Sequence, residues 1–183
     1  MVRTRERVAV WQRIGTRPSP VMVWTPEQTG AFLDSAAHDP LYARYHLIAL
    51  RGLRRGEAVG LSWPDVDLDG GWLLVREQVV QLGWRTMRTT PKAGSERVLA
   101  LGPDATAEVF TRPDGLLVHP DYVTRHFARL IAQAGLPPIR VHDLRHGAAT
   151  LALASGVEMK VVQDTLGHSS ITITSDTYTS ELP

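Results

Sequence analysis

Cysteine is absent from the 183-residue sequence, which excludes a disulfide-stabilised scaffold, a thiolate metal site and a cysteine nucleophile. Long hydrophobic runs are absent as well, because stretches such as 47–50 are far shorter than the roughly 20 apolar residues of a membrane-spanning helix. The Arg-rich N-terminus lacks the apolar core of a signal peptide. These absences predict a soluble, cytoplasmic protein without a membrane partner.

Neither sign of charge is in large excess, since 20 Lys and Arg against 19 Asp and Glu give a net charge of +1. The distribution is uneven. Residues 1–17 hold five Arg and one Glu, which leaves 15 basic and 18 acidic residues in the remainder. Phosphate binding needs a local concentration of Lys and Arg, so a basic arm on a slightly acidic body is a weak indication of nucleic-acid binding.

The composition is that of a single folded domain. Hydrophobic residues make up 43% and charged residues 21% of the chain, which excludes wholesale disorder. The Pro-rich stretch that ends at Pro20 favours an extended linker, because proline restricts its own backbone and that of the residue before it. We therefore expect a basic arm and linker over 1–20 and one domain over 21–183.

Helix signals dominate the domain. Thr25 and Gln28 have the spacing of a capping box, and Pro26 fits the first helical position, so a helix is predicted from residue 26 to about 37. The same reasoning from apolar spacing, glycine and proline predicts helices over 40–50, 53–61, 120–134, 143–155 and 158–166.

In one part of the sequence the spacing of apolar residues changes from that of a helix to that of a strand. Residues 72–80, 84–88 and 97–101 are short runs rich in Val, Leu and Trp, separated by turn residues. They predict a three-stranded antiparallel sheet. The expected fold class is mainly α with this one small sheet.

Two groups of residues in the first half could carry chemistry. Arg54 and Glu57 lie three apart and would share a helix face, although taken alone they fit an ordinary surface ion pair. Lys92 lies in a turn between two expected strands, where a single lysine is usually just solvated.

The second half adds histidine, arginine and tyrosine. His142 and Arg145 would share a helix face, pairing a titratable imidazole with a fork of donors suited to phosphate oxygens. His142 and His146 have the spacing of a helical metal pair, but the Glu expected beside the first His is missing. His168 follows a glycine, and Tyr178 alone would fit a packing residue.

Taken in order, these segments resemble the catalytic domain of the tyrosine recombinases, the phage integrase family, over roughly 25–183. Each motif is weak alone, but the ordered set is specific. The motifs are Gly-Leu-Arg-Arg-Gly-Glu at 52–57, Ser-Trp-Pro-Asp-Val-Asp at 62–67, Pro-Lys at 91–92, His-Asp-Leu-Arg-His at 142–146, Leu-Gly-His-Ser-Ser at 166–170 and Asp-Thr-Tyr at 176–178.

The resemblance implies a site-specific recombinase or integrase that cleaves double-stranded DNA through a 3′-phosphotyrosine, with Tyr178 as the nucleophile. Because the covalent intermediate keeps the bond energy, such enzymes need no ATP, metal or other cofactor. The family pattern assigns Arg54 and Arg145 to the non-bridging phosphate oxygens, Lys92 to protonation of the leaving 5′ oxygen, His142 to proton transfer, His168 to a hydrogen bond with the phosphate, and Glu57 to support of this array.

The resemblance also implies self-association on DNA, as a tetramer like those of the family. Few side chains between 169 and 179 can fill a core. We therefore expect Tyr178 to lie away from Arg54 and Arg145 until the protein assembles on DNA. With a body of negative net charge, we expect DNA binding to be weak, salt-sensitive and carried mostly by the arm.

The sequence departs from the family pattern at several points. Arg51 stands where a small hydroxyl residue is usual, and Ala93 replaces a common Thr. The interval 101–118 is short, no core-binding domain precedes the catalytic domain, and the chain stops at Pro183, soon after Tyr178. These departures lead us to expect a catalytic domain with a shortened middle and truncated C-terminus, as a fragment, an engineered piece or a degenerate copy.

Three alternatives to an active recombinase stay open. The first is a non-catalytic DNA-binding remnant of an integrase. The second is a type IB topoisomerase, which shares the chemistry but is less compatible with the Leu-Gly-His-Ser-Ser segment. The third is a metal hydrolase built on His142 and His146.

Overall fold

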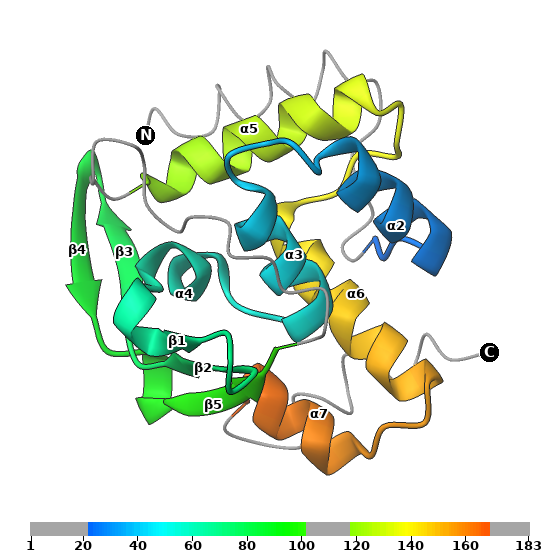
Figure 1. Cartoon of the computed structure of the whole chain (residues 1–183). Helices are drawn as coiled ribbons and strands as arrows, with labels where there is room; N and C mark the ends of the chain where they lie inside the picture. Colours follow the sequence, from blue (N-terminus) through cyan, green and yellow to red (C-terminus); the bar gives the residue numbers. More distant parts are fainter. Residues whose placement is uncertain (1–21, 102–117, 169–183) are drawn as a thin grey trace.

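The computed structural model describes residues 22–101 and 118–168 (Figure 1). The predicted arm, the interval 102–117 and the segment with Tyr178 lie outside the described residues. The elements in chain order are α2 (Pro26–Ser35), α3 (Tyr42–Arg51), α4 (Arg55–Gly60), the short helix η1 (Trp63–Asp65), β1 (Val66–Asp67), β2 (Trp72–Val75), β3 (Gln78–Leu82), β4 (Arg85–Thr89), the short helix η2 (Lys92–Gly94), β5 (Arg97–Ala100), α5 (Pro120–Gln133), α6 (Val141–Ala154) and α7 (Met159–Leu166).

The helices begin where local capping supports them. The predicted capping box of α2 is confirmed, since the Thr25 hydroxyl accepts a hydrogen bond from the Gln28 amide and the Gln28 side chain accepts one from the Thr25 amide. Helix α6 begins at Val141, two residues before the predicted start, because the Asp143 carboxylate accepts a hydrogen bond from the Arg140 amide at 2.8 Å. This earlier start places His142 in the first turn.

The three-stranded antiparallel sheet is present, but its strands are not the predicted set. Strand β2 pairs with β1 on one side and β5 on the other, whereas β3 and β4 form a separate hairpin. The single strand expected over 72–80 was therefore wrong. Residues 90–96, which connect β4 to β5, form the turn that carries Lys92 instead of continuing a strand. Residues 72–75 therefore pair with β5 and residues 78–82 with β4, and no single partner strand spans 72–80.

Helix α4 packs closely on the β3–β4 hairpin. A Cβ atom at Gly56 would lie 2.8 Å from the Val79 carbonyl oxygen, and one at Gly60 would lie 2.9 Å from the Gln78 Cα. Only glycine allows this approach of the two backbones. The contact fixes α4 against the strands that lead to the Lys92 turn.

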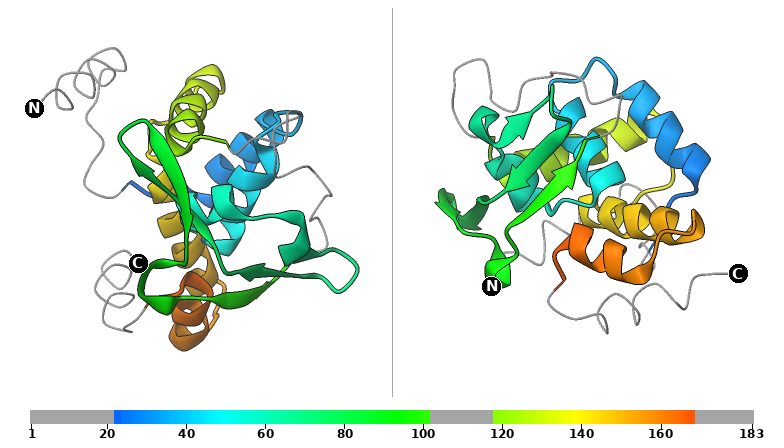
Figure 2. Two further views of the ribbon diagram at one scale, coloured as in Figure 1. Left: turned by 90° about the vertical axis from the view of Figure 1, so that its left-hand side faces the viewer. Right: turned by 60° about the horizontal axis from the view of Figure 1, so that its bottom comes forward.

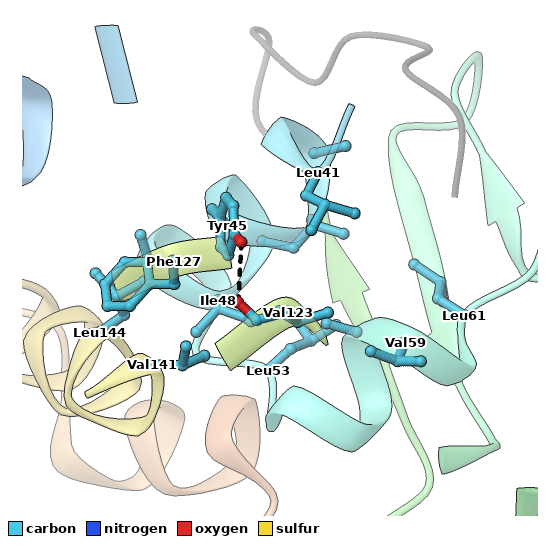
Figure 3. Packing of buried hydrophobic residues seen from close by; sticks show 14 of the residues in the cluster. Leu41, Tyr45, Ile48, Leu53, Val59, Leu61, Val123, Phe127, Val141 and Leu144 are labelled. Carbon is cyan, nitrogen blue, oxygen red and sulfur yellow. Dashed lines mark hydrogen bonds between the residues drawn. The ribbon is translucent and has the colours of Figure 1, made fainter. Parts of the chain in front are cut away.

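The main core lies between α2, α3, α5 and α6. Phe32, Tyr45 and Phe127 contact one another with ring centroids 5.1 to 5.6 Å apart, and the Tyr45 hydroxyl donates to the Val123 carbonyl at 3.1 Å (Figure 3). Leu53, from the connection between α3 and α4, is fully buried in the same core. The core therefore holds the start of α4 against α5 and α6.

The strands lie along one side of the molecule and α2 along the other, and α5 runs across the top from β3 towards α2 (Figure 1). Helix α7 lies beside both β5 and α6 (Figure 2). Segments distant in sequence thus meet at the C-terminal end of α7. Within the part of the chain that the structure describes, no helix has the length and apolar character needed to cross a bilayer.

Candidate active site

Arg54 is held at the N-terminus of α4 by the turn that precedes it. Gly52 ends α3 in the left-handed conformation, with φ of 64°, and a Cβ there would lie 2.5 Å from the Leu166 side chain. Glycine therefore allows both the sharp turn and the contact with α7. Arg54 follows in extended conformation and keeps 25% of its side chain exposed.

Glu57 lies one turn further along α4 with a completely buried side chain. Its carboxylate accepts hydrogen bonds from the Arg54 amide at 2.8 Å and from Arg54 Nη1 at 2.7 Å. Burial alone would raise the pKa of this carboxyl, but hydrogen bonds from Arg97 and Arg54 outweigh burial and lower the pKa below its ordinary value. Glu57 is therefore ionised at neutral pH.

Arg145 lies on α6 with only 2% of the residue exposed. Its Nη1 donates to the Gly52 carbonyl, and its Nη2 donates to the Leu166 carbonyl at 2.7 Å. The guanidinium thus joins the end of α3 to the end of α7.

Three successive carbonyl groups at the end of α7 each accept a hydrogen bond from a different arginine. The last carbonyls of a helix lack partners within the helix and carry partial negative charge, so cations stabilise them. Here the cations come from three other elements of the fold. The pairs are Thr165 O with Arg97 Nε at 2.7 Å, Leu166 O with Arg145 Nη2 at 2.7 Å, and Gly167 O with Arg54 Nη2 at 2.9 Å.

His168 follows this carbonyl array directly. Gly167 ends α7 in the left-handed conformation, and the His168 amide then donates to the Gln163 carbonyl at 3.1 Å. Desolvation, and then the positive charges of Arg145 and Arg54, lower the pKa of His168 to about 4. The ring is therefore neutral at pH 7 and offers one donor and one acceptor.

His142 and His146 lie on the same helix as Arg145, with ring centroids 4.8 Å apart and nearly perpendicular planes. His142 lies at the surface, yet partial desolvation by surrounding atoms, followed by His146 and Arg145, lowers its pKa to about 4. The pKa of His146 is lowered for similar reasons. Among the residues of the two described ranges, no group of three His, Asp or Glu forms a cluster that could hold a metal ion.

Lys92 is exposed in the turn between β4 and β5, and Ser95 of that turn connects it to the arginines. Arg54 Nη1 donates to the Ser95 hydroxyl at 3.3 Å. At the other end of the turn, the Gln78 side chain donates to the Thr90 carbonyl at 2.9 Å. The turn is thus fixed to β3 at one end and to Arg54 at the other.

The structure brings most of the predicted residues into one region. Arg54, Glu57, Arg145 and His168 meet around the end of α7, with His142 on α6 beside them and Lys92 on a turn that Arg54 contacts. Tyr178 lies outside the described residues. Residues at the site that sequence reasoning did not single out are Ser95 and Arg97.

Arg97 carried a signal that could have revealed it. It shares a strand face with Leu99, since side chains two apart in a strand point the same way. Leu99 is buried, so the alternation places the Arg97 guanidinium inside the protein as well. A buried arginine requires partners, and its place just after the Lys92 turn indicates where they lie.

The comparison with known families decides the identity of the chain. The Phage integrase family model matches residues 23–183. The chain belongs to the phage integrase family. This confirms the resemblance that the ordered motifs indicated.

Individual relatives agree with this assignment. A tyrosine recombinase XerC of Pelobacter propionicus is 32% identical over 156 residues, which cover 82% of this chain and 48% of the relative. The chain spans about half the length of the curated relatives that it matches.

Solved structures show the same fold. The Tn1549 transposon integrase in complex with a circular intermediate DNA superposes with a TM-score of 0.76 at 21% identity, covering 92% of this chain and 64% of that one. A lambda integrase tetramer bound to a Holliday junction gives a TM-score of 0.65 at 22% identity, covering 95% and 55%. The mainly helical fold class is thereby confirmed.

Proposed function

We propose that this chain carries the catalytic centre of a site-specific DNA recombinase or integrase that cleaves and rejoins strands through a 3′-phosphotyrosine. The observation that supports this best is the meeting of Arg54, Arg145 and His168 at the end of α7. A pentacoordinate phosphate carries extra negative charge, and pre-arranged cations and donors stabilise it. Family membership supplies the class of reaction.

In the proposed reaction, the Tyr178 hydroxyl oxygen bonds to the phosphorus while the bond from phosphorus to the 5′ oxygen breaks. Lys92 gives a proton to the departing 5′ oxygen, and neutral His142 takes up the tyrosine proton. A 5′ hydroxyl of another strand then reverses the step, which restores the phosphodiester and frees Tyr178. No external energy source is needed, because the phosphotyrosine keeps the energy of the original bond.

The charge and the exposure of the remaining residues indicate a different role for each of them. Arg54 and His168 both reach the surface and would contact the phosphate oxygens directly. Arg145 is buried beneath them, and its positive charge would stabilise the negative charge of the phosphate. Glu57 would support the array by fixing Arg54.

Double-stranded DNA is the proposed partner, and a tetramer on DNA is the proposed active assembly. The Tn1549 integrase and lambda integrase structures contain DNA, and one lambda structure is a tetramer. Strand exchange between two duplexes requires four cleavage events, so four copies of one tyrosine site meet that need.

The test is covalent capture. Nicked suicide substrates, cut from the DNA that flanks the gene, are incubated with the protein and separated by denaturing electrophoresis. We expect an adduct with the parent chain and with Tyr122→Phe, a control at an exposed tyrosine of α5. Tyr178→Phe should form none, since only the attacking hydroxyl is removed.

Each alternative predicts a different outcome. DNA binding without any adduct would favour the non-catalytic remnant. Relaxation of supercoiled plasmid without exchange between sites would favour topoisomerase activity. An adduct that persists in Tyr178→Phe would place the nucleophile elsewhere and contradict the proposal.

A further inference from the structure

Arg97 contacts three separate parts of the candidate site through one side chain. It lies on β5 and is only 8% exposed. Its Nη2 donates to Glu57 Oε2 at 2.8 Å and its Nη1 to Glu57 Oε1 at 3.3 Å. Nη1 also donates to the Ser95 carbonyl at 3.1 Å, and Nε donates to the Thr165 carbonyl at 2.7 Å.

These contacts connect the elements that carry the proposed catalytic groups. Glu57 fixes Arg54, so the Arg97 bond to Glu57 acts on that arginine. Ser95 belongs to the turn that presents Lys92. Thr165 begins the carbonyl array that His168 follows. Arg54 contacts the same three parts from the partly exposed side, through Glu57, the Ser95 hydroxyl and the Gly167 carbonyl, whereas Arg97 contacts them from the buried side.

The charges around Glu57 give Arg97 a second consequence. One buried carboxylate lies between two guanidinium groups, with Arg97 on the inner side and Arg54 on the outer side. Because Arg97 can neutralise Glu57, the positive charge of Arg54 is left in excess at the surface. Without Arg97, the Glu57 carboxylate would pair with Arg54 alone, and its negative charge would offset much of the positive charge of Arg54.

Close packing leaves little room for another arrangement. A Cβ atom at Gly167 would lie 3.0 Å from Arg97 Nη1 and 3.0 Å from the Ser95 Cβ. The guanidinium therefore fills the space beneath the end of α7. Lysine carries one nitrogen on a flexible stem and cannot reach Glu57, Ser95 and Thr165 at the same time.

We infer that Arg97 is a positioning residue, which holds Arg54, the Lys92 turn and the His168 end of α7 in their working arrangement without contacting DNA. The inference rests on the proposed function. It differs from the roles that the family pattern assigns, because those belong to Arg54, Lys92, His142, Arg145, His168 and Tyr178, with Glu57 in support, and not to Arg97.

The first experiment compares three variants in single-turnover adduct formation and in DNA binding by fluorescence anisotropy. Arg97→Met removes the charge and the donors, Arg97→Lys keeps the charge alone, and Arg129→Met is a control at an exposed arginine of α5. We expect Arg97→Met to slow adduct formation at least about 10-fold while DNA affinity changes less than about twofold, the pattern of lost transition-state stabilisation. Arg129→Met should change neither.

The pH dependence of the adduct-formation rate distinguishes the effect of the Arg97 charge from the effect of the Arg97 hydrogen-bond geometry. Arg97 and Arg54 are the charged groups that face Glu57, and together they lower the pKa of its carboxyl. Arg97→Met should therefore move the acidic limb of the rate profile to higher pH. Arg97→Lys should return that limb towards the parent position while the rate at its plateau stays low. A residue that only stabilised the fold would leave the limb in place.

A measurement independent of activity distinguishes failure of this inference from failure of the proposed function. The His168 ring, which Arg145, Arg54, His146 and Arg97 all face, is titrated by NMR. Arg97→Met should raise its pKa and shift its resonances, whereas Arg129→Met should not. If the parent chain forms no adduct, this titration alone decides the inference.

Two results would overturn the role of Arg97. One is a parent-like rate in Arg97→Met when the parent forms the adduct and Tyr178→Phe does not. The other is an unchanged His168 titration in Arg97→Met. If Arg97→Met does not fold, Arg97→Lys takes its place, and a parent-like plateau rate or unchanged His168 resonances in that variant contradict the inference.

Discussion

At the scale of single residues, Arg145 combines a structural and a proposed chemical role. Its two terminal nitrogens bind the Gly52 and Leu166 carbonyls, so the guanidinium is fixed by the ends of two helices. A charge held in this way needs no reorganisation when a phosphate arrives, which is what electrostatic stabilisation of a transition state requires. The same bonds mean that a substitution here affects stability as well as cleavage.

Replacing Arg145 by Lys should separate the guanidinium fork from its charge. The ammonium group cannot bind Gly52 and Leu166 simultaneously, so we expect adduct formation to fall by a factor of about 100 or more while DNA affinity changes little. The free energy of unfolding should also decrease, by roughly 2 kcal/mol, because one buried carbonyl loses its donor. Single-turnover kinetics and urea denaturation measure the two effects. Cleavage at the parent rate would contradict the assignment.

The lowered pKa of His168 predicts a dependence of stability on pH. The ordinary value is 6.5 and the folded value is about 4, so the unfolded chain binds the proton first as the pH falls. The free energy of unfolding should therefore be highest above pH 6.5 and should decrease steadily towards pH 4. Urea denaturation across this range should show a smaller decrease for His168→Gln. Identical pH profiles for the two proteins would show that His168 contributes no such linkage.

At the scale of elements, the sequence predicted structure well where the signal is local and poorly where it depends on distant partners. The capping box at Thr25 and the glycine stop at Gly167 are read from a few neighbouring residues, and both are present. The strand expected over 72–80 was wrong because its first half pairs with β5, beyond the Lys92 turn, whereas its second half pairs with the neighbouring β4. Strand pairing is non-local, so composition alone did not reveal where the ladder breaks.

Gly167 provides a test of the α7 terminus as an element. Gly167→Ala adds a Cβ in a left-handed conformation, with φ of 65°, and also presses on Arg97 and Ser95. Gly135→Ala is a matched control, because φ there is 66° and nothing lies within 4 Å. Both should lose about 1–2 kcal/mol through backbone strain. Gly167→Ala should lose about 1–3 kcal/mol more through overpacking.

The comparison is made by chemical denaturation of both variants, with adduct formation as a second measurement. Gly167→Ala should slow the adduct because it displaces the arginines that bind the α7 carbonyls. Gly135→Ala should react at the parent rate. Equal losses of stability in the two variants would show that the end of α7 tolerates the added methyl group.

At the scale of the whole molecule, the candidate site is assembled from segments that the sequence spreads over more than 110 residues. Arg54 and the Gly167 carbonyl are 113 positions apart and meet at 2.9 Å. The ordered motifs revealed which residues belong to the site, since their identity and order are visible in the sequence. They did not reveal Arg97, because its role depends on contacts with α4 and α7 that only the folded chain creates.

The distribution of charge over the whole molecule predicts how it binds DNA. Residues 1–17 hold five of the 20 basic residues, whereas residues 18–183 carry three more acidic than basic groups. The body therefore offers a local positive site on a surface of negative net charge, and long-range attraction should come mainly from the arm. Changing the five arm arginines to Gln, at unchanged length, isolates this contribution.

Each arginine that contacts a phosphate adds about 0.9 to the slope of log affinity against log salt concentration. The five-fold Gln variant should therefore lower that slope by as much as about 4.5 and weaken binding at low salt. Fluorescence anisotropy at several salt concentrations measures the slope, with the flanking DNA and an unrelated duplex of equal length. Similar losses on both duplexes are expected, because phosphate contacts carry no sequence information. Nanomolar, sequence-specific binding by residues 18–183 at physiological salt would instead place recognition in the body, where Arg54 and the Lys92 turn lie.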